Sequence, residues 1–182
     1  MRERLAVPLR SLQPLSLPLL ALLTTLTAFG AGLTLMTHMH HRALRFIEPG
    51  AMESFDSGYE LLSDVTVIPV GVFGLVCTLA LLVLRPPGVP RWMLATTAAL
   101  QLSVFVTRIW MWGAWAEEVR EAGSVRLADG TLHPSYTQYM DTNWIRIALI
   151  ASYAALALTM TVLAARRART SGAARGAVPA VV

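Results

Sequence analysis

Four continuous apolar stretches constrain the fold of this chain more than any other feature. They cover residues 15–36, 65–84, 92–115 and 145–165. A helix needs about 20 apolar residues to cross a hydrocarbon core of about 30 Å, and each stretch meets that length. Continuous runs also differ from the alternating pattern of transmembrane β-barrel strands. The sequence therefore predicts an all-α fold, an antiparallel bundle of four transmembrane helices.

The composition excludes several classes of protein. Hydrophobic residues make up 55% of the 182 residues and charged residues 14%, which argues against a disordered chain and against an ordinary soluble domain. The 15 basic residues are all arginines that gather at the termini and in short connections, so the net charge of +4 does not indicate nucleic-acid binding. The single cysteine, Cys77, excludes an intrachain disulfide. No complete catalytic motif is present, and no cofactor is indicated.

The distribution of arginine predicts the orientation in the membrane. Cytoplasmic connections carry an excess of arginine and lysine. The side of the two termini and the middle connection carries Arg2, Arg4, Arg10, Arg85, Arg91, Arg166, Arg167, Arg169 and Arg175. We therefore expect a multi-pass plasma-membrane protein with both termini in the cytoplasm. An alternative is that residues 1–30 form a cleaved signal peptide.

The connections divide the chain into three parts. Residues 1–14 are predicted to be a cytoplasmic segment, 15–166 the four-helix domain, and 167–182 a disordered cytoplasmic tail. The first turn signal after the first span is Glu48-Pro49-Gly50, so helical extensions are expected on the outer face. A small β-hairpin around Asp129-Gly130 is a further expectation.

Polar side chains within apolar helices are costly and indicate functional or helix-packing sites. Helical spacing places His38 and His41 on one face of the first helix, and Glu60 and Asp64 lie one turn apart on the second. Alternating helix directions bring such residues to the outer third of the bundle. The candidate polar pocket near the outer face comprises His38, His41, Glu60, Asp64, Arg108, Asn143 and Arg146.

Most of these groups also have a purely structural interpretation. Arg108 is expected to face the interior and a carboxylate, with Asp64 the first candidate, and the pair would either hold helix register or face a substrate. The histidines would be interfacial residues at a helix end. Alternatively, His38 and His41 would bind a metal with Glu60 or Asp64. The interface aromatics of an outer belt are Trp110, Trp112, Trp115 and Trp144.

Two short motifs carry a resemblance to a known family. The first span contains Phe29-Gly30-Ala31-Gly32, and Asn143-Trp144-Ile145-Arg146 opens the last span. With these motifs the chain resembles, over residues 15–166, the anthrone-oxygenase-like family of small four-helix membrane proteins. The family order is Trp-Asn where this chain has Asn-Trp, and the Asp129-Gly130 hairpin is an addition. The resemblance implies a compact bundle and, for some members, cofactor-independent oxygenation of polycyclic aromatic anthrones.

Three functions are compatible with these features. The favoured one is a non-catalytic accessory or interaction protein, whose acidic outer hairpin meets a membrane-protein partner. The first alternative is an oxidoreductase or oxygenase-like enzyme for a lipophilic, aromatic small molecule. In that enzyme His38, His41 or Glu60 would be the base, and Arg108 or Arg146 would hold the developing oxyanion. The second alternative is a small transporter, although the first span has no acidic residue.

Membrane lipid surrounds the spans in each of these functions. The glycine-bearing faces of the first two helices would also let a second copy of the chain pack closely, as a homo-oligomer.

Overall fold

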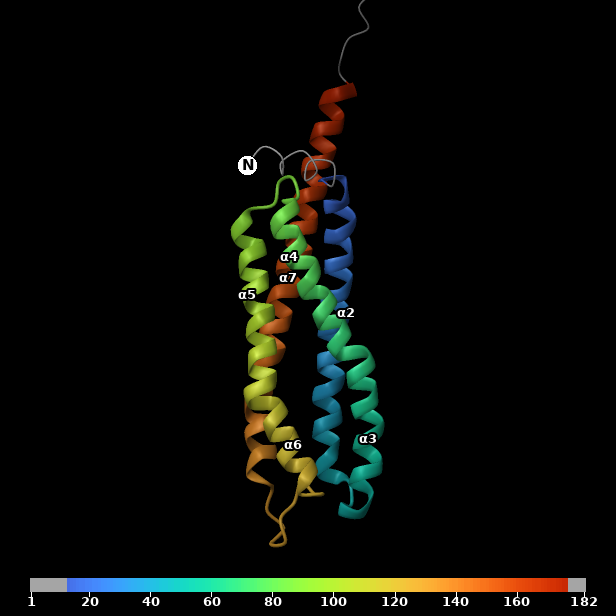
Figure 1. The fold of residues 1–182 in the computed structure, drawn as a ribbon, viewed down its shortest axis with the longest axis vertical. Helices are drawn as coiled ribbons and strands as arrows, with labels where there is room; N and C mark the ends of the chain where they lie inside the picture. Colours follow the sequence, from blue (N-terminus) through green and yellow to red (C-terminus); the bar gives the residue numbers. More distant parts are fainter. Residues whose placement is uncertain (1–12, 177–182) are drawn as a thin grey trace, which may run out of the picture.

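The chain forms four long, antiparallel helical segments. The computed structural model describes residues 13–176. Figure 1 shows the segments side by side, with the connection between α4 and α5 at one end and the two other connections at the opposite end. We call the latter the outer end, after the predicted orientation. The helices are α2 (Ser16–Ala43), α3 (Met52–Leu62), α4 (Ile68–Leu84), α5 (Arg91–Thr107), α6 (Gly113–Glu121) and α7 (Pro134–Gly176). The prediction of an all-α four-helix bundle is confirmed.

The four segments are long and apolar enough to cross a membrane. Large apolar side chains cover the outside of the bundle, as lipid contact requires; Phe73 is 62% exposed and Leu158 57% exposed. Inside, an apolar core fills the end nearest the α4–α5 connection and includes Leu23, Leu81 and Met160. Cys77 belongs to this core, which agrees with its position in an apolar run.

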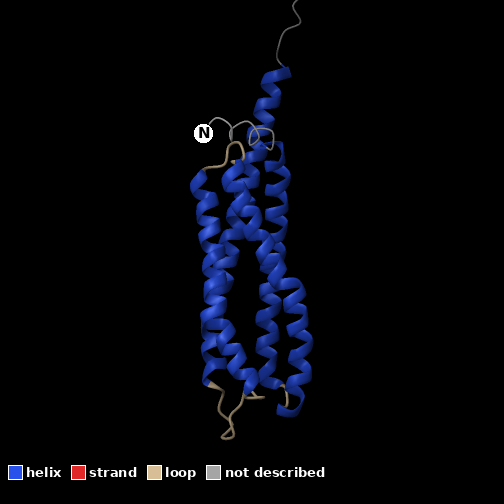
Figure 2. Ribbon diagram, in the orientation of Figure 1, coloured by secondary structure: helices blue, strands red, loops and turns tan. Residues whose placement is uncertain are grey.

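A second, smaller core holds the outer ends of the helices together. It is built from Leu44, Met52, Val119, Val125 and Tyr136. These residues come from the extensions beyond the apolar spans, so the extensions have a core of their own. The helical extensions expected on the outer face are therefore present. Within the described residues no strand forms between α6 and α7 (Figure 2), where a single antiparallel bridge joins Arg126 and Leu132.

Threonine hydroxyls join α2 to α7 within the span. The hydroxyl of Thr24 lies 2.7 Å from that of Thr161 and also donates to the carbonyl of Ala157 at 3.2 Å. Hydrogen bonds of this kind hold membrane helices together because lipid offers no competing partner.

The last helix continues further than the sequence predicted. Disorder was expected from residue 167, but α7 is helical to Gly176. Alanine and arginine, which dominate this stretch, are both strong helix formers. Residues 177–182 of the expected tail, and 1–12 of the N-terminal segment, lie outside the described residues.

Each of the two middle segments contains one π-helical turn. Ser63–Val67 joins α3 to α4, and Arg108–Trp112 joins α5 to α6. The first π turn comes directly before Pro69, which lacks an N–H and would clash with a carbonyl one turn back in a regular helix. Figure 1 shows that α3 and α4, on either side of this turn, are not collinear.

Glycine explains the second π turn. The backbone N–H of Gly113 donates to the carbonyl of Arg108, five residues earlier. A Cβ atom at Gly113 would lie only 2.5 Å from that carbonyl oxygen, so the turn requires glycine here. Turns of this type are frequent at functional sites.

Candidate functional site

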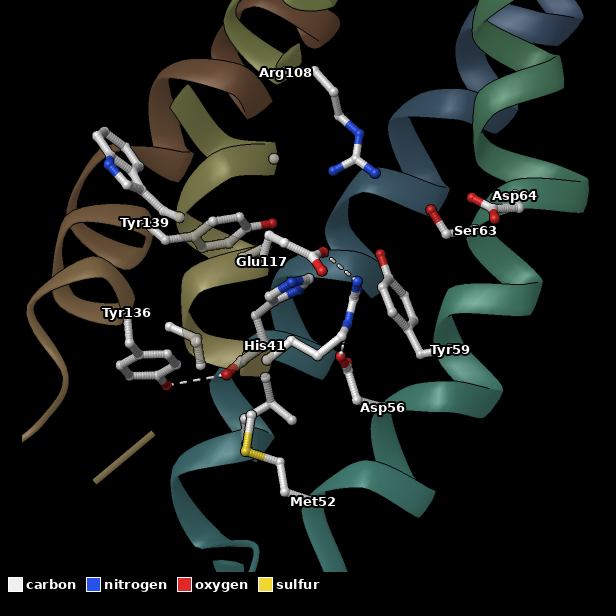
Figure 3. Close-up of a pocket in the computed structure, with 16 residues that line it drawn as sticks. His41, Met52, Asp56, Tyr59, Ser63, Asp64, Arg108, Glu117, Tyr136 and Tyr139 are labelled. Atoms are coloured by element: carbon white, nitrogen blue, oxygen red, sulfur yellow. Dashed lines mark hydrogen bonds and ion pairs between the residues drawn. The ribbon is translucent and has the colours of Figure 1, made fainter. Parts of the chain in front are cut away.

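A pocket of about 170 Å³ opens among the outer parts of the helices. We call it the outer pocket. Figure 3 shows polar side chains from α2, α3, α6 and α7 and from both π turns around it. The polar or charged residues that line it are His41, Asp56, Tyr59, Ser63, Asp64, Arg108, Glu117, Arg120, Tyr136 and Tyr139.

Asp56 is the centre of a charged network at this pocket. One carboxylate oxygen lies 3.1 Å from Nε2 of His40 on α2, and the other accepts from Nε of Arg120 on α6 at 3.4 Å. Arg120 also binds Glu117. The ring of His40 stacks between Phe55 and Tyr59, with its centroid 4.9 and 3.9 Å from theirs. The network therefore ties α2, α3 and α6 together.

His41 is held in one orientation by its neighbours. Its Nδ1 lies 2.9 Å from the carbonyl of Thr37, and its ring stacks on Tyr139 with centroids 4.4 Å apart. A carbonyl can only accept, so Nδ1 carries the proton and Nε2 of the neutral ring is the basic atom. Nε2 has no hydrogen-bond partner among the side chains that the structure describes. A base is therefore positioned at the outer pocket.

A second cavity, of about 300 Å³, lies deeper in the bundle. We call it the inner cavity. All four helical segments line it, and most of its lining is apolar, including Val67, Val104, Phe105 and Ile150. Tyr59, Ser63 and Arg108 line both the outer pocket and the inner cavity, so the two adjoin.

Glycine provides much of the space for this cavity. Gly30, Gly71 and Gly74 line it. A Cβ atom at Gly71 would lie 3.2 Å from the ring of Phe105, and one at Gly74 would lie 3.3 Å from Nε2 of Gln101. Larger residues at these positions would occupy the cavity or displace its wall.

Two arginines form the polar end of the inner cavity. Arg146 is 5% exposed; it donates to the hydroxyl of Tyr139 at 2.9 Å, and its Nε has no partner. Its guanidinium lies 5.5 Å from the ring centroid of Trp112, a cation–π contact. Arg108 makes no hydrogen bond or ion pair with the side chains that the structure describes, which do not include that of Glu60. Deeper in the cavity, the buried Oε1 of Gln101 also lacks a partner.

The structure divides the candidate residues of the sequence among several places. His41, Asp64 and Arg108 line the outer pocket, and Arg108 and Arg146 line the inner cavity. His38 is not in either, because it lies about 60° from His41 around the helix. It faces α7 instead, where its Nδ1 is 2.8 Å from the amide of buried Asn143. The side chain of Glu60 lies outside the described part of the structure.

Two expected pairings are not observed. Arg108 and Asp64 lie on different sides of the outer pocket in Figure 3, and no ion pair between them is found. Asp64 sits at the exposed side of the first π turn, whereas Arg108 points inward from the second. Among the described residues, no three His, Cys, Asp or Glu side chains come together as a metal site.

The four tryptophans of the predicted aromatic belt differ in their exposure. Trp110 and Trp144 are 77% and 63% exposed on the outside of the bundle. Trp112 is only 1% exposed, and its indole N–H donates to Thr142 at 3.0 Å. Trp112 is therefore a core residue, because it lies on the helix face that also carries Arg108. Trp115 lines the outer pocket.

Sequence reasoning did not identify Asp56 and Tyr59 as site residues. Met52, Asp56, Tyr59 and Ser63 recur at spacings of four, three and four residues, which is one helix face. That period was available in the sequence, and it marks the face of α3 that lines the outer pocket.

Comparison with known proteins adds no relative. No protein-family model, no curated protein and no solved structure matches this chain. The resemblance to the anthrone-oxygenase-like family therefore stays a prediction.

Proposed function

We propose that this chain is a non-catalytic membrane protein that binds a lipophilic small molecule in the inner cavity. The observation that carries the proposal is the cavity itself: about 300 Å³, mostly apolar, and lined by all four helical segments. Ligand sites are concave, largely apolar and supplied with a few polar groups, and they commonly lie between the helices of bundles. In this proposal the protein serves as an accessory or carrier protein for its ligand.

The position of the cavity supports a lipophilic ligand. Ile68 and Ile109 line it and are 38% and 67% exposed on the apolar outside of the bundle. A molecule dissolved in the bilayer would therefore meet apolar side chains between α4 and α5 before it reached the interior. The arginine distribution supports an orientation with both termini in the cytoplasm and the outer pocket on the opposite side of the plasma membrane.

Co-purification tests the proposal with a matched pair of variants. Gly30 lines the inner cavity, where an added Cβ atom would meet only a methyl group of Val70 at 3.5 Å. Gly32, two residues along α2, has nothing within 4 Å of such an atom. We expect Gly30→Leu to fill the cavity and Gly32→Leu to leave it open.

The measurement is mass spectrometry of the organic extract from protein purified in mild detergent. We expect a lipophilic compound with wild type and Gly32→Leu, and about tenfold less with Gly30→Leu, since a cavity clash costs on the order of 1.4 kcal/mol. The same yield from all three proteins, or no compound from wild type, would refute binding in the inner cavity.

The geometry of His41 favours a second candidate function, an enzyme that removes a proton α to a carbonyl. His41, whose Nε2 is the basic atom, lines the outer pocket together with Arg108. A base and a cation at one site are the groups that deprotonation and enolate stabilisation need.

Deuterium exchange tests this second candidate. In deuterated water, the enzyme would catalyse exchange at the α-carbon of a lipophilic ketone such as dodecan-2-one. We expect His41→Gln to slow the exchange by about 100-fold and His133→Gln, at the start of α7, to have no effect. Exchange at the uncatalysed rate with wild type would rule out this chemistry for the ketone.

A further inference from the structure

We propose that the ligand of the inner cavity is an anionic amphiphile, whose negatively charged head group lies between Arg108 and Arg146. This inference rests on the proposed function and adds the chemical class of the ligand. Lipophilic carboxylates belong to this class.

The charge of the inner cavity carries the argument. Its lining contains two arginines and, among the described residues, no aspartate, glutamate or histidine. Arginine cannot be neutralised by loss of a proton in a protein, and an uncompensated charge within a membrane domain is costly. A bound anion would offset part of this positive charge and could accept hydrogen bonds from both guanidinium groups.

Arg146 gives the site a rigid wall. It is 5% exposed, packs against the rings of Trp112 and Tyr139, and donates from Nη2 to the Tyr139 hydroxyl. These contacts use only part of its donor capacity, and Nε remains buried without a partner. A carboxylate or similar anion accepts hydrogen bonds from two such donors at once.

Arg108 completes the site from the neighbouring helical segment, because α5 and the π turn that follows it pack against α7. Its guanidinium points into the space between the helices in Figure 3, from the π turn that re-aims this part of the chain. It borders both the outer pocket and the inner cavity, and so does Tyr59, whose hydroxyl donates to Thr37 at 2.8 Å.

The described carboxylates at the outer pocket form no ion pair with these arginines. Asp56 is bound to His40 and Arg120, and Glu117 is bound to Arg120. Asp64 is exposed and makes no ion pair with Arg108 within residues 13–176. The side chain of Glu60, one turn before Asp64, is not described.

The apolar part of the cavity suits the tail of such a ligand. From Arg108 the lining continues through Val104 and Phe105 toward Gln101, which lies about 10 Å further along the helix by its rise per residue. An amphiphile would therefore lie with its head toward the outer pocket and its tail toward the apolar core.

Equilibrium binding of two probes tests the inference. The probes are radiolabelled dodecanoate and dodecan-1-ol, which differ in the head group and share the chain. The protein is used in nanodiscs of neutral lipid, with binding to empty nanodiscs subtracted. We expect wild type to bind dodecanoate about tenfold more tightly than the alcohol, as charge-assisted hydrogen bonds allow.

Variants assign this preference to the site. Arg108→Gln is expected to remove the preference and Arg108→Lys to keep part of it, because lysine retains the charge. Arg166→Gln, which changes the net charge equally on the exposed part of α7, is expected to keep it in full. Dodecanoate is also expected to raise the melting temperature of wild type in a concentration-dependent manner.

Each outcome decides a different claim. Equal binding of the acid and the alcohol to wild type would overturn the anionic head group and leave a lipophile site in place. A preference that Arg166→Gln abolishes would assign it to bulk charge and overturn the site at Arg108. Saturable binding of neither probe would overturn both the inference and the proposed function. If Arg108→Gln does not fold, the comparison of the two probes on wild type still tests whether the site prefers an anionic head group.

Discussion

Asp56 joins three helices through one carboxylate. It is 9% exposed and is bound by His40 from α2 and Arg120 from α6. A buried carboxylate is stable only when its oxygens are well paired. Removing one partner of such a pair costs more free energy than the intact pair contributes to stability. The carboxylate of Asp56 therefore helps to hold the helices around the outer pocket in place.

At this scale we predict that Asp56→Asn lowers the free energy of unfolding. Asparagine preserves the size of the side chain but loses the charge that binds Arg120, which should cost about 1–3 kcal/mol. Thermal unfolding in detergent measures the effect. Glu53→Gln is the matched control, because Glu53 is an exposed acid on the same helix. Equal melting temperatures for the two variants would show that the network contributes no stability.

The two π turns determine the site at the scale of elements. Ser63 and Arg108 each begin one of them, and both residues line the outer pocket and the inner cavity. A π turn contains one more residue than a regular turn, so it rotates the following side chains and widens the helix. The two turns lie on helical segments that face each other across the cavity.

We predict that Gly113→Ala disrupts the second π turn. The new Cβ atom would lie 2.5 Å from the carbonyl oxygen of Arg108. The backbone would have to move to relieve this contact. We expect the free energy of unfolding to fall by about 1–3 kcal/mol. We also expect the variant to lose the binding of dodecanoate. Thermal unfolding and equilibrium binding measure the two effects.

Gly58→Ala provides the control for this prediction. Gly58 lies within α3 with nothing within 4 Å of an added Cβ atom, so alanine there should stabilise the helix by about 0.5–1 kcal/mol. If Gly113→Ala and Gly58→Ala changed the melting temperature in the same direction and by the same amount, the steric contact with the Arg108 carbonyl would not explain the effect.

The whole molecule combines a membrane-spanning bundle with an outer extension that has its own core. The apolar core lies near the α4–α5 connection, the smaller core lies at the outer end, and the two adjoining cavities lie between them. The polar side chains that line the two cavities therefore lie between the two apolar cores.

At this scale we predict the orientation of the bundle. In a Cys77→Ala background, Ala128→Cys on the outer connection should react with a membrane-impermeant maleimide on intact cells. Pro87→Cys, on the exposed turn between α4 and α5, should react only after permeabilisation. The opposite pattern would place both termini outside and contradict the orientation proposed from arginine counts.

Much of the fold was predictable from local features of the sequence. The span around residues 65–84 is uniformly apolar, and Pro69 predicts a bend, because length, hydropathy and a missing N–H act within one helix. The start of the last helix at Pro134 was predictable in the same way. The exposed Trp110 and Trp144 follow from their position at the ends of spans.

The candidate site was predictable only in part. The lengths and directions of the spans were enough to place His41, Arg108 and Arg146 toward one end of an antiparallel bundle. The packing of the helices was needed to show that His38 turns to Asn143, that Trp112 is buried, and that Asp56 binds His40 and Arg120. Hydropathy and helical period specify which part of a helix lies in the membrane, but the neighbour that meets a given side chain depends on how whole helices rotate and pack.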